Sequence, residues 1–405
     1  MNLRRFMVRI AAIGLGNRTC KYLQYVKEHA EDVVLVAVVE PERGRRLAVM
    51  SEFGLAEDLC FNSVDHLWNS DIQLDAVIVG SPDLTHFHIS MGCLKRGWHV
   101  LLEKPAASTV EECTALMHES QTRGLSLCVC YVLRYHPYYI SLKSILEDVD
   151  FGKLVSVKHT INVGLDRMAH TFVRGFWSCS DESSPIIVSK ASHDVDLLYW
   201  LTDRKFKVIA SEGKLNRYKK ENAPAGSATR CVHCGIEKEC RFSAVDLYLR
   251  RDDWNSSFDI REGETRVESI IRELNEGRFG RCVYCCDNDV VDFQTVEMVT
   301  DDGCKVSMTI DGLTSEDSRI TRFIFENGEV YADGRVVKVI SDGVDHVYDM
   351  SNLCCMPLHA GADHKIVEDF LNSVSKGTQL RGTDIETAFH SHEVCFAAED
   401  MRMSR

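Results

Sequence analysis

The sequence predicts an α/β protein with two domains: a doubly wound parallel sheet, then an α/β domain with an open, mostly antiparallel sheet and a cysteine-rich insertion. Three observations predict it. Up to about residue 132, short apolar runs alternate with amphipathic stretches, as in β-α-β units. From Leu154, apolar and polar residues alternate, which is typical of a sheet with one wet face. Residues 223–288 are polar and rich in cysteine, so we expect domains over residues 1–132 and 133–405, the insertion lying in the second.

In the first domain, the expected strands are nearly unbroken apolar runs, because helices cover both faces of such a sheet. Thr109 and Glu112, three residues apart, predict a capping box at the start of one helix. The expected strands are Phe6–Ile13, Val33–Val39, Asp75–Gly80, His99–Leu102 and Leu125–Tyr131, and the expected helices are Arg18–Glu28, Thr85–Lys95 and Thr109–Arg123.

In the second domain, the alternating pattern predicts a sheet with an exposed face, and two helices close the chain. Such a face favours association with further copies, so we expect a homo-oligomer. The expected strands are Leu154–Val163, Lys207–Leu215, Val291–Val299, Lys305–Ile310, Arg319–Glu326 and Val336–Ile340, and the expected helices are Asp363–Ser375 and Asp384–Met401.

Composition narrows the class of protein. With 47 basic and 61 acidic residues the net charge is −14, which argues against binding nucleic acid or an anionic membrane through the overall field. An odd count of 17 cysteines in a long chain argues against a disulfide framework. The N-terminal apolar run is too short to span a bilayer and lacks a signal-peptide cleavage site. We therefore expect a protein of the reducing cytoplasm.

A glycine-rich turn follows the first expected strand and opens the first helix. Gly14 permits the tight turn, and Gly16 lets the backbone approach a pyrophosphate held at the helix N-terminus by Asn17 and Arg18. Thr19 stands where the G-x-G-x-x-G pattern has its third glycine. The turn predicts a dinucleotide site, although such turns also occur in doubly wound sheets without one.

An acidic residue ends the second expected strand and strengthens this prediction. Glu40 lies 24 residues after Gly16, where an acid binds the adenosine ribose hydroxyls. A carboxylate there repels a 2′-phosphate, so the sequence favours NAD over NADP. Arg18 or Arg43 could still accommodate NADP.

Two further segments lie at the carboxyl ends of expected strands, where ligands of such sheets bind. The first contains Ser81, Pro82 and His86, and the second contains Glu103 and Lys104. We expect all five residues to line the cofactor site. Without this context, Glu103 and Lys104 would be an exposed ion pair before a turn.

These segments, with His193-Asp194-Val195-Asp196, resemble the glucose–fructose oxidoreductase/inositol dehydrogenase/MocA (Gfo/Idh/MocA) family. The resemblance covers nearly the whole chain, including Arg134-Tyr135-His136-Pro137 and Phe151-Gly152-Lys153-Leu154. It implies an NAD(P)-binding Rossmann domain, an open-faced α/β domain and an active site between them. Most members oxidise or reduce sugars and polyols, and some hydrolyse glycosides with a tightly bound NAD.

The resemblance also implies residue roles. Lys104 resembles the family lysine beside the nicotinamide and the substrate hydroxyl. His193 and Asp196 resemble the histidine and the final acid of the pattern Asp-x-x-x-His-x-x-Asp. The first Asp of that pattern is replaced by Ser189, and Lys190 follows it.

The chemistry of hydride loss from a carbinol carbon suits these residues. The hydroxyl proton needs a base, and positive charge stabilises the developing oxyanion. A lysine of lowered pKa does both, and a second lysine lowers that pKa further. We predict Lys104 and Lys190 as this pair and His193 as the proton carrier, with Lys190, His193 and Asp194 on one face of a helix. A packed histidine and a solvated lysine are the alternatives.

Five residues are predicted to contact the substrate. Arg174 and Trp177 suit a carbohydrate, the tryptophan as an apolar platform for a sugar face. Tyr135 lies at the domain junction, and Asp194 and Asp196 lie beside His193. Each is equally compatible with a packing role.

The insertion predicts a metal site. Two C-x-x-C pairs about 50 residues apart can enclose a tetrahedral zinc ion, and four thiolates can also hold an iron–sulfur cluster. The role would be structural, because the insertion lacks an evident core. Buried cysteines or a redox pair are the alternatives. The predicted ligands are Cys231, Cys234, Cys240, Cys282 and Cys286, and Cys285 competes for the fourth position.

The sequence thus predicts an NAD(P)-dependent oxidoreductase acting on a sugar, glycoside or polyol bound between the domains. One alternative is a redox-neutral glycosidase or lyase that acts through a transient ketosugar and elimination. Another is a regulator that senses nucleotide or sugar without catalysis.

Overall fold

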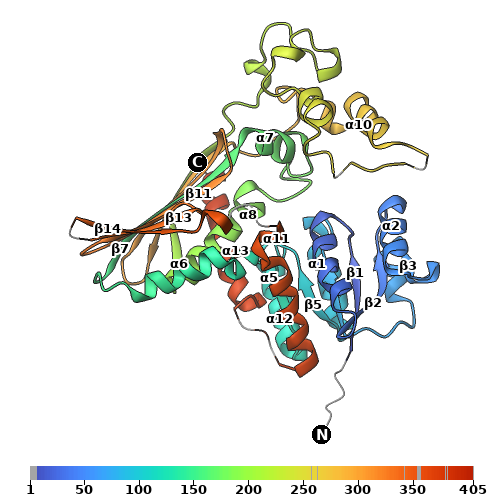
Figure 1. The fold of residues 1–405 in the computed structure, drawn as a ribbon, viewed down its shortest axis with the longest axis horizontal. Helices are drawn as coiled ribbons and strands as arrows, with labels where there is room; N and C mark the ends of the chain where they lie inside the picture. The colour runs from blue at the N-terminus through green and yellow to red at the C-terminus, as the bar shows by residue number, and fades with distance from the viewer. Residues whose placement is uncertain are drawn as a thin grey trace. The chain divides into compact units, whose positions relative to one another are not determined.

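The computed structural model describes residues 7–256, 258–261, 263–341, 343–353, 357–378, 380 and 382–404. The chain forms two compact units (Figure 1). Unit 1 comprises Met1–Ser141 and Leu353–Glu393, and unit 2 comprises Leu142–Asn352 and Val394–Arg405. These units differ from the predicted division after residue 132, because Leu353–Glu393 belongs to the N-terminal unit.

Unit 1 contains the predicted doubly wound sheet. Its strands are ordered β3-β2-β1-β4-β5-β6, and every neighbouring pair is parallel. The carboxyl ends of all these strands therefore lie at one edge. The strands are β1 Val8–Ile13, β2 Val33–Val39, β3 Cys60–Phe61, β4 Ala76–Val79, β5 His99–Leu102 and β6 Leu127–Val129, and the helices are α1 Asn17–Glu28, α2 Arg43–Phe53, α3 Val64–Trp68, α4 His86–Lys95 and α5 Val110–Arg123.

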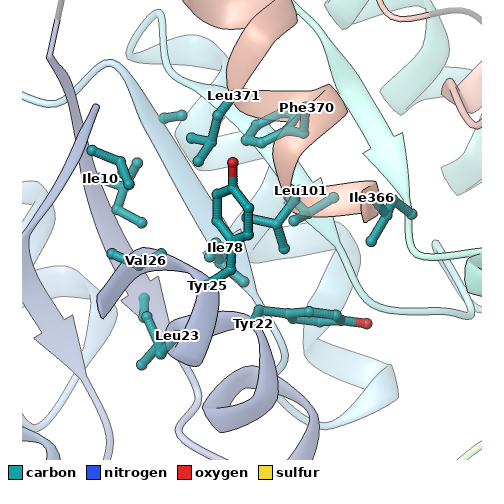
Figure 2. Close-up of a cluster of buried hydrophobic side chains, with 14 of the residues drawn as sticks. Ile10, Tyr22, Leu23, Tyr25, Val26, Ile78, Leu101, Ile366, Phe370 and Leu371 are labelled. Atoms are coloured by element: carbon teal, nitrogen blue, oxygen red, sulfur yellow. The ribbon is translucent and has the colours of Figure 1, made fainter. Parts of the chain in front are cut away.

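The C-terminal helix α12 (Ala362–Lys376) belongs to the core of unit 1. Its apolar face contributes Ile366, Phe370 and Leu371 to the cluster of buried residues that includes α1 and the central strands. Figure 2 shows these three side chains in one cluster with Tyr25 of α1 and Ile10 of β1, Leu371 being drawn nearer to these two than Ile366 is. Helices α6 (Pro137–Asp148) and α13 (Ile385–Met403) each run from one unit into the other.

Unit 2 contains the second predicted sheet, ordered β14-β13-β12-β11-β7-β10-β9-β8. Its pairs are antiparallel apart from β7 with β10. Two strands have no counterpart in the prediction: β12 is only four residues long, and β14 is exposed along its whole length. The strands are β7 Leu154–Gly164, β8 Phe206–Lys214, β9 Phe293–Thr300, β10 Lys305–Thr314, β11 Ser318–Phe325, β12 Glu329–Ala332, β13 Val336–Ser341 and β14 Val344–Asp349, and the helices are α7 Leu165–Arg167, α8 Ile186–Ser189, α9 Ser192–Thr202 and α10 Arg266–Asn275.

The cysteine-rich insertion has a small hydrophobic core of its own, contrary to the expectation that it lacks one. Cys231, Tyr248, Phe258, Ile270 and Leu274 are among its buried members. A capping box of Thr265 and Glu268 begins α10. Within the described part of the chain, no helix is both long and apolar enough to span a bilayer.

Candidate functional site

The glycine-rich turn lies between β1 and α1. Gly14 has φ +81°, and a Cβ there would stand 2.7 Å from the Gly80 carbonyl oxygen, so only glycine fits. Gly16 is the N-cap of α1 and makes no side-chain cap. Because the first N–H groups of a helix, including that of Asn17, have no acceptor within it, this N-terminus suits a phosphate.

Thr19 replaces the third glycine of the motif without loss of close packing. Its side chain is fully buried, and a Cβ on Gly80 would lie 2.2 Å from its hydroxyl oxygen. Gly80, at the end of β4, therefore provides the room that a glycine in α1 would otherwise give.

Glu40 is held at the carboxyl end of β2, beside this turn. Only 7% of the residue is exposed, and its carboxylate accepts hydrogen bonds from the N–H groups of Leu15 at 2.7 Å and Glu42 at 3.0 Å. The carboxylate is thus fixed next to the glycine-rich turn. A strand, a glycine turn, an uncapped helix N-terminus and an acid in this arrangement fit an adenine dinucleotide.

The loop after β4 contains Ser81, Pro82 and His86. The Ser81 hydroxyl accepts from the Thr85 hydroxyl at 2.7 Å, and Pro82 precedes the short 3₁₀ turn η2 (Asp83–Thr85). His86 is buried, and its ring nitrogens lie 2.8 Å from the Ser81 carbonyl oxygen and 2.6 Å from that of Pro105. His86 therefore joins the loops after β4 and β5.

Glu103 and Lys104 follow β5 at the same edge of the sheet. The Glu103 carboxylate accepts from Tyr22 at 2.5 Å and from Arg18 at 3.1 Å. Burial alone raises the pKa of Glu103, but the charges of Arg18 and Lys104 and these hydrogen bonds lower it overall. Arg18 also donates to Asp363 at 2.6 Å. Its guanidinium is thus engaged by two carboxylates, which makes Arg18 a poor partner for a 2′-phosphate.

Lys190, in unit 2, lies in a turn between α8 and α9. The prediction that it shares one helix face with His193 and Asp194 is wrong, because the helix begins again at Ser192. Burial first, and then the charges of Arg319 and Arg167, lower the pKa of Lys190 to about 7. An amine of this kind can accept or release a proton near neutral pH.

Asp194 is the centre of a buried ionic network near Lys190. It accepts from His159 at 3.1 Å and from Arg319 at 2.5 and 3.2 Å, and His159 also contacts the Thr321 hydroxyl at 2.8 Å. Burial opposes the charge on Asp194, but Arg319 and His159 outweigh it and hold its pKa well below the usual range. Asp194 is fully buried and Asp196 is 1% exposed, so neither is open to a substrate.

The other three predicted substrate contacts, Tyr135, Arg174 and Trp177, differ in burial and in the groups they contact. Tyr135 ends the 3₁₀ turn η3 (Val132–Tyr135) and packs against the core of unit 1 instead of beginning a helix. Arg174 is buried and donates to the carbonyl oxygens of Phe242 at 2.6 Å and Arg281 at 2.7 Å. Trp177 is partly exposed and stays a candidate. Arg174 is thus held inside unit 2, whereas Tyr135 is partly buried and stays a predicted contact.

The structure does not support the predicted metal centre at Cys231, Cys234, Cys240, Cys282 and Cys286. The first four line one small cavity together with Arg174. The Cys231 sulfur accepts from Arg174 at 3.6 Å and from the Ala244 N–H at 3.4 Å, and Cys286 donates to the Cys282 carbonyl at 3.3 Å. The positively charged guanidinium of Arg174 beside the thiols disfavours binding of a metal cation there. Among the described residues, no three His, Cys, Asp or Glu side chains are grouped to hold a metal ion.

The described cysteines in both units are free thiols. Burial raises the pKa of several of them, that of Cys282 to about 12. Cys354 and Cys355 lie outside the described residues.

Comparison with known proteins gives a family match for the N-terminal domain. Residues 8–131 match the model of the Gfo/Idh/MocA oxidoreductases, described as an oxidoreductase family with an NAD-binding Rossmann fold. The match covers the Rossmann domain of the chain, which is therefore similar to the NAD-binding domain of this family. The family resemblance and the fold predicted from the sequence are thereby confirmed, and the chain carries an NAD(P)-binding oxidoreductase domain.

Its relatives by sequence include inositol 2-dehydrogenase 1 of Saccharopolyspora erythraea, 29% identical over 195 residues, 48% of this chain and 54% of that protein. The putative oxidoreductase YteT of Bacillus subtilis is 24% identical over 242 residues, 58% of this chain and 55% of that protein. The chain thus matches about half the length of these curated relatives.

Solved structures extend the likeness to the whole fold. UDP-N-acetylglucosamine 3-dehydrogenase GnnA from Acidithiobacillus ferrooxidans is 17% identical, with a TM-score of 0.65 over 98% of this chain and 99% of that one. An Agrobacterium radiobacter oxidoreductase in complex with NAD+, L-tartaric acid and magnesium is 13% identical, with a TM-score of 0.70 over 98% and 97%. The 3-ketoreductase KijD10 from Actinomadura kijaniata, in complex with NADP and TDP-benzene, is 14% identical, with a TM-score of 0.66 over 98% of each chain. At these identities the likeness concerns the fold.

Sequence reasoning did not assign roles to several residues that organise both candidate sites. Asp363 is fully buried and reaches Arg18 from α12, and His159 and Arg319 reach Asp194 from β7 and β11. The only local signal was the presence of charged or histidine residues in segments of predicted strand or helix. Such residues require a buried partner, but the sequence does not say which.

Proposed function

We propose that this chain is an NAD(P)-dependent oxidoreductase that acts on a carbinol carbon of a sugar, glycoside or polyol. One observation carries the proposal: the glycine-rich turn, Glu40 and Lys104 all follow parallel strands of one sheet and share its carboxyl edge. Relatives named as inositol dehydrogenases, and a fold shared with a nucleotide-sugar dehydrogenase and a 3-ketoreductase, support the substrate class.

The cofactor site is proposed to use the N-terminus of α1 for the pyrophosphate and Glu40 for the adenosine ribose. When bound, the nicotinamide supplies an acceptor for hydride. NAD is favoured, because the ionised Glu40 carboxylate would lie beside the phosphate of NADP. Ser81, Pro82 and His86 form the loop after β4, next along the sheet from the glycine turn.

The proton is proposed to be managed by this chain's own lysines and histidine. As the carbinol C–H bond gives up its hydride, the O–H bond gives its proton to a base and a carbonyl forms. Lys104 is the candidate at the cofactor edge of unit 1. Lys190 and His193 are the candidates in unit 2, and the lowered pKa of Lys190 supports a proton-accepting role.

The test is turnover by the purified protein with NAD+ or NADP+ and a set of polyols, sugars and glycosides, followed by NADH or NADPH absorbance. Lys104→Met is expected to lower kcat by about 100-fold or more, because general acid–base groups contribute factors of that size. Nucleotide affinity, measured by fluorescence titration, is expected to change little. Lys95→Met, at an exposed lysine ending α4, is the matched control.

Three results would contradict the proposal. Full activity of Lys104→Met would remove Lys104 from the reaction. Release of an aglycone without net NADH formation would indicate redox-neutral glycoside cleavage. Nucleotide binding with no turnover of any tested class would favour a sensing role.

A further inference from the structure

The peptide unit that joins Pro105 to Ala106, directly after Lys104, is held at both of its polar atoms by buried histidines. Its carbonyl oxygen lies 2.6 Å from Nδ1 of His86, and its N–H donates to Nε2 of His392 at 2.8 Å. His86 begins α4 and is 1% exposed, whereas His392 comes from α13 and is fully buried. Two elements far apart in the sequence thus converge on one peptide.

The contacts of His392 identify its tautomer. Nε2 accepts the Ala106 N–H and therefore carries no hydrogen. Nδ1 lies 2.8 Å from the Ala388 carbonyl oxygen, to which it donates, and 3.3 Å from the Tyr131 hydroxyl. Burial, and then the positive charges of His86 and Lys104, lower the pKa of His392 to about 4, which keeps the ring neutral.

His86 offers the opposite hydrogen-bonding character. Both of its ring nitrogens face carbonyl oxygens, that of Pro105 and that of Ser81. Carbonyl oxygens only accept, so both contacts are hydrogen bonds only when each ring nitrogen carries a hydrogen. The two histidines therefore present a donor to one end of the peptide unit and an acceptor to the other.

This peptide unit matters because it fixes the backbone next to Lys104. On the other side, the Lys104 N–H donates to the Glu103 carboxylate at 3.1 Å. The chain is consequently anchored before and after the lysine, at the end of β5. Small displacements of a reacting group lower rates strongly, so such anchoring bears on catalysis.

We propose that His86 and His392 are positioning residues for Lys104, which they hold through the Pro105–Ala106 peptide, His86 as donor and His392 as acceptor. The inference rests on the proposed function, in which Lys104 handles the substrate proton. It adds a pair of residues, one of them from the C-terminal helix, that act through the backbone and do not touch substrate.

The first test compares His392→Leu, which removes the acceptor, with His392→Gln, whose side-chain oxygen can still accept from Ala106. His392→Leu is expected to lower kcat by about 100-fold with nucleotide affinity and KM little changed, and His392→Gln to recover most of that loss. His118→Leu, at an exposed histidine of α5, is the control. Equal kcat in His392→Leu and the unchanged protein, or a parallel loss of nucleotide affinity, would overturn the proposal.

A second measurement is independent of turnover and uses the unchanged protein, so the folding of a variant does not affect it. Nitrogen NMR spectra of labelled histidines are expected to show hydrogen on Nδ1 of His86 and none on Nε2 of His392. The opposite tautomer of His392, or no hydrogen on Nδ1 of His86, would overturn the proposal.

A third measurement tests the positioning role even if no substrate is found. The lack of a substrate would count against the proposed function and not against the positioning of Lys104. Reductive methylation of Lys104, measured by mass spectrometry relative to Lys95, is expected to change several-fold in His392→Leu and little in His392→Gln. An unchanged ratio in His392→Leu would show that the histidine does not position Lys104.

Discussion

The two units place their candidate lysines in different electrostatic surroundings. In unit 1, Lys104 directly follows a buried carboxylate, Glu103, at the end of a parallel strand. In unit 2, Lys190 lies in a turn where Arg319 and Arg167 add positive charge. The difference indicates that the chain offers two kinds of amine: one beside a negative charge, and one whose pKa suits proton exchange at neutral pH. The predictions below test whether this division holds.

Each unit also contains an arginine–aspartate pair with a fully buried aspartate, Arg18–Asp363 in unit 1 and Arg319–Asp194 in unit 2. Asp194→Asn is expected to destabilise the protein by about 3–5 kcal/mol, because it leaves Arg319 and the buried His159 without their anion. Asp363→Asn should have a smaller effect, since Arg18 keeps Glu103, and His359, whose Nδ1 lies 2.9 Å from Asp363, is 42% exposed. Urea unfolding measures both, and Glu329→Ala, in the exposed pair with Arg322, should change stability by less than about 1 kcal/mol. Equal losses for the two aspartates would break the comparison.

Acid is expected to weaken both units through buried neutral histidines. In unit 1, burial first, and then the charges of His86 and Lys104, lower the pKa of His392 to about 4. In unit 2, burial first, and then the charges of Arg174 and Arg167, lower the pKa of His170 to about 4. Since the folded pKa lies below the unfolded value of about 6.5, the stabilisation is complete above that pH and is lost as pH falls from 6.5 towards 4.

For His392 this loss is about 3 kcal/mol, a shift of roughly 2.5 pKa units at 1.36 kcal/mol each. His392→Gln should flatten the dependence of unfolding free energy on pH in this window. His170→Gln should do the same; in the unchanged protein the His170 ring contacts the Tyr248 hydroxyl at 3.0 Å. A dependence confined to pH below 4 would instead assign acid sensitivity to carboxylates such as Asp194 and Asp363.

The pH profile of kcat separates the two lysines. A lowered pKa of about 7 means that Lys190 loses its proton near neutral pH, so a base role predicts that kcat rises through this region. Lys190→Met should abolish that rise and lower kcat by about 100-fold, or about 2.7 kcal/mol. Arg319→Met removes one of the charges that lower the pKa and should move the rise to higher pH. A rise that survives in Lys190→Met would transfer the role to another group.

The contrast between the units also explains which parts could be predicted from sequence. In unit 1, the glycine turn, Glu40 and Lys104 each follow a parallel strand, and the strand pattern alone places them at one edge. In unit 2, Lys190 and Asp194 depend on Arg319 and His159, which join them only through the pairing of β7 with β11. The cysteines show the same limit: spacing predicted a metal held by two C-x-x-C pairs, but not that Arg174 would lie among the thiols.

The smallest expected effect concerns the cofactor, and it tests how far the backbone motif of unit 1 determines specificity. Glu40→Ser removes the carboxylate that disfavours a 2′-phosphate, while a hydroxyl remains for the ribose. The ratio of kcat/KM for NADP+ to that for NAD+ should rise by about tenfold, equivalent to about 1.4 kcal/mol. Arg18, held by Glu103 and Asp363, is not expected to contribute, so Arg18→Lys should leave the ratio unchanged. If Arg18→Lys shifts the ratio while Glu40→Ser does not, selectivity lies in α1 and not at the end of β2.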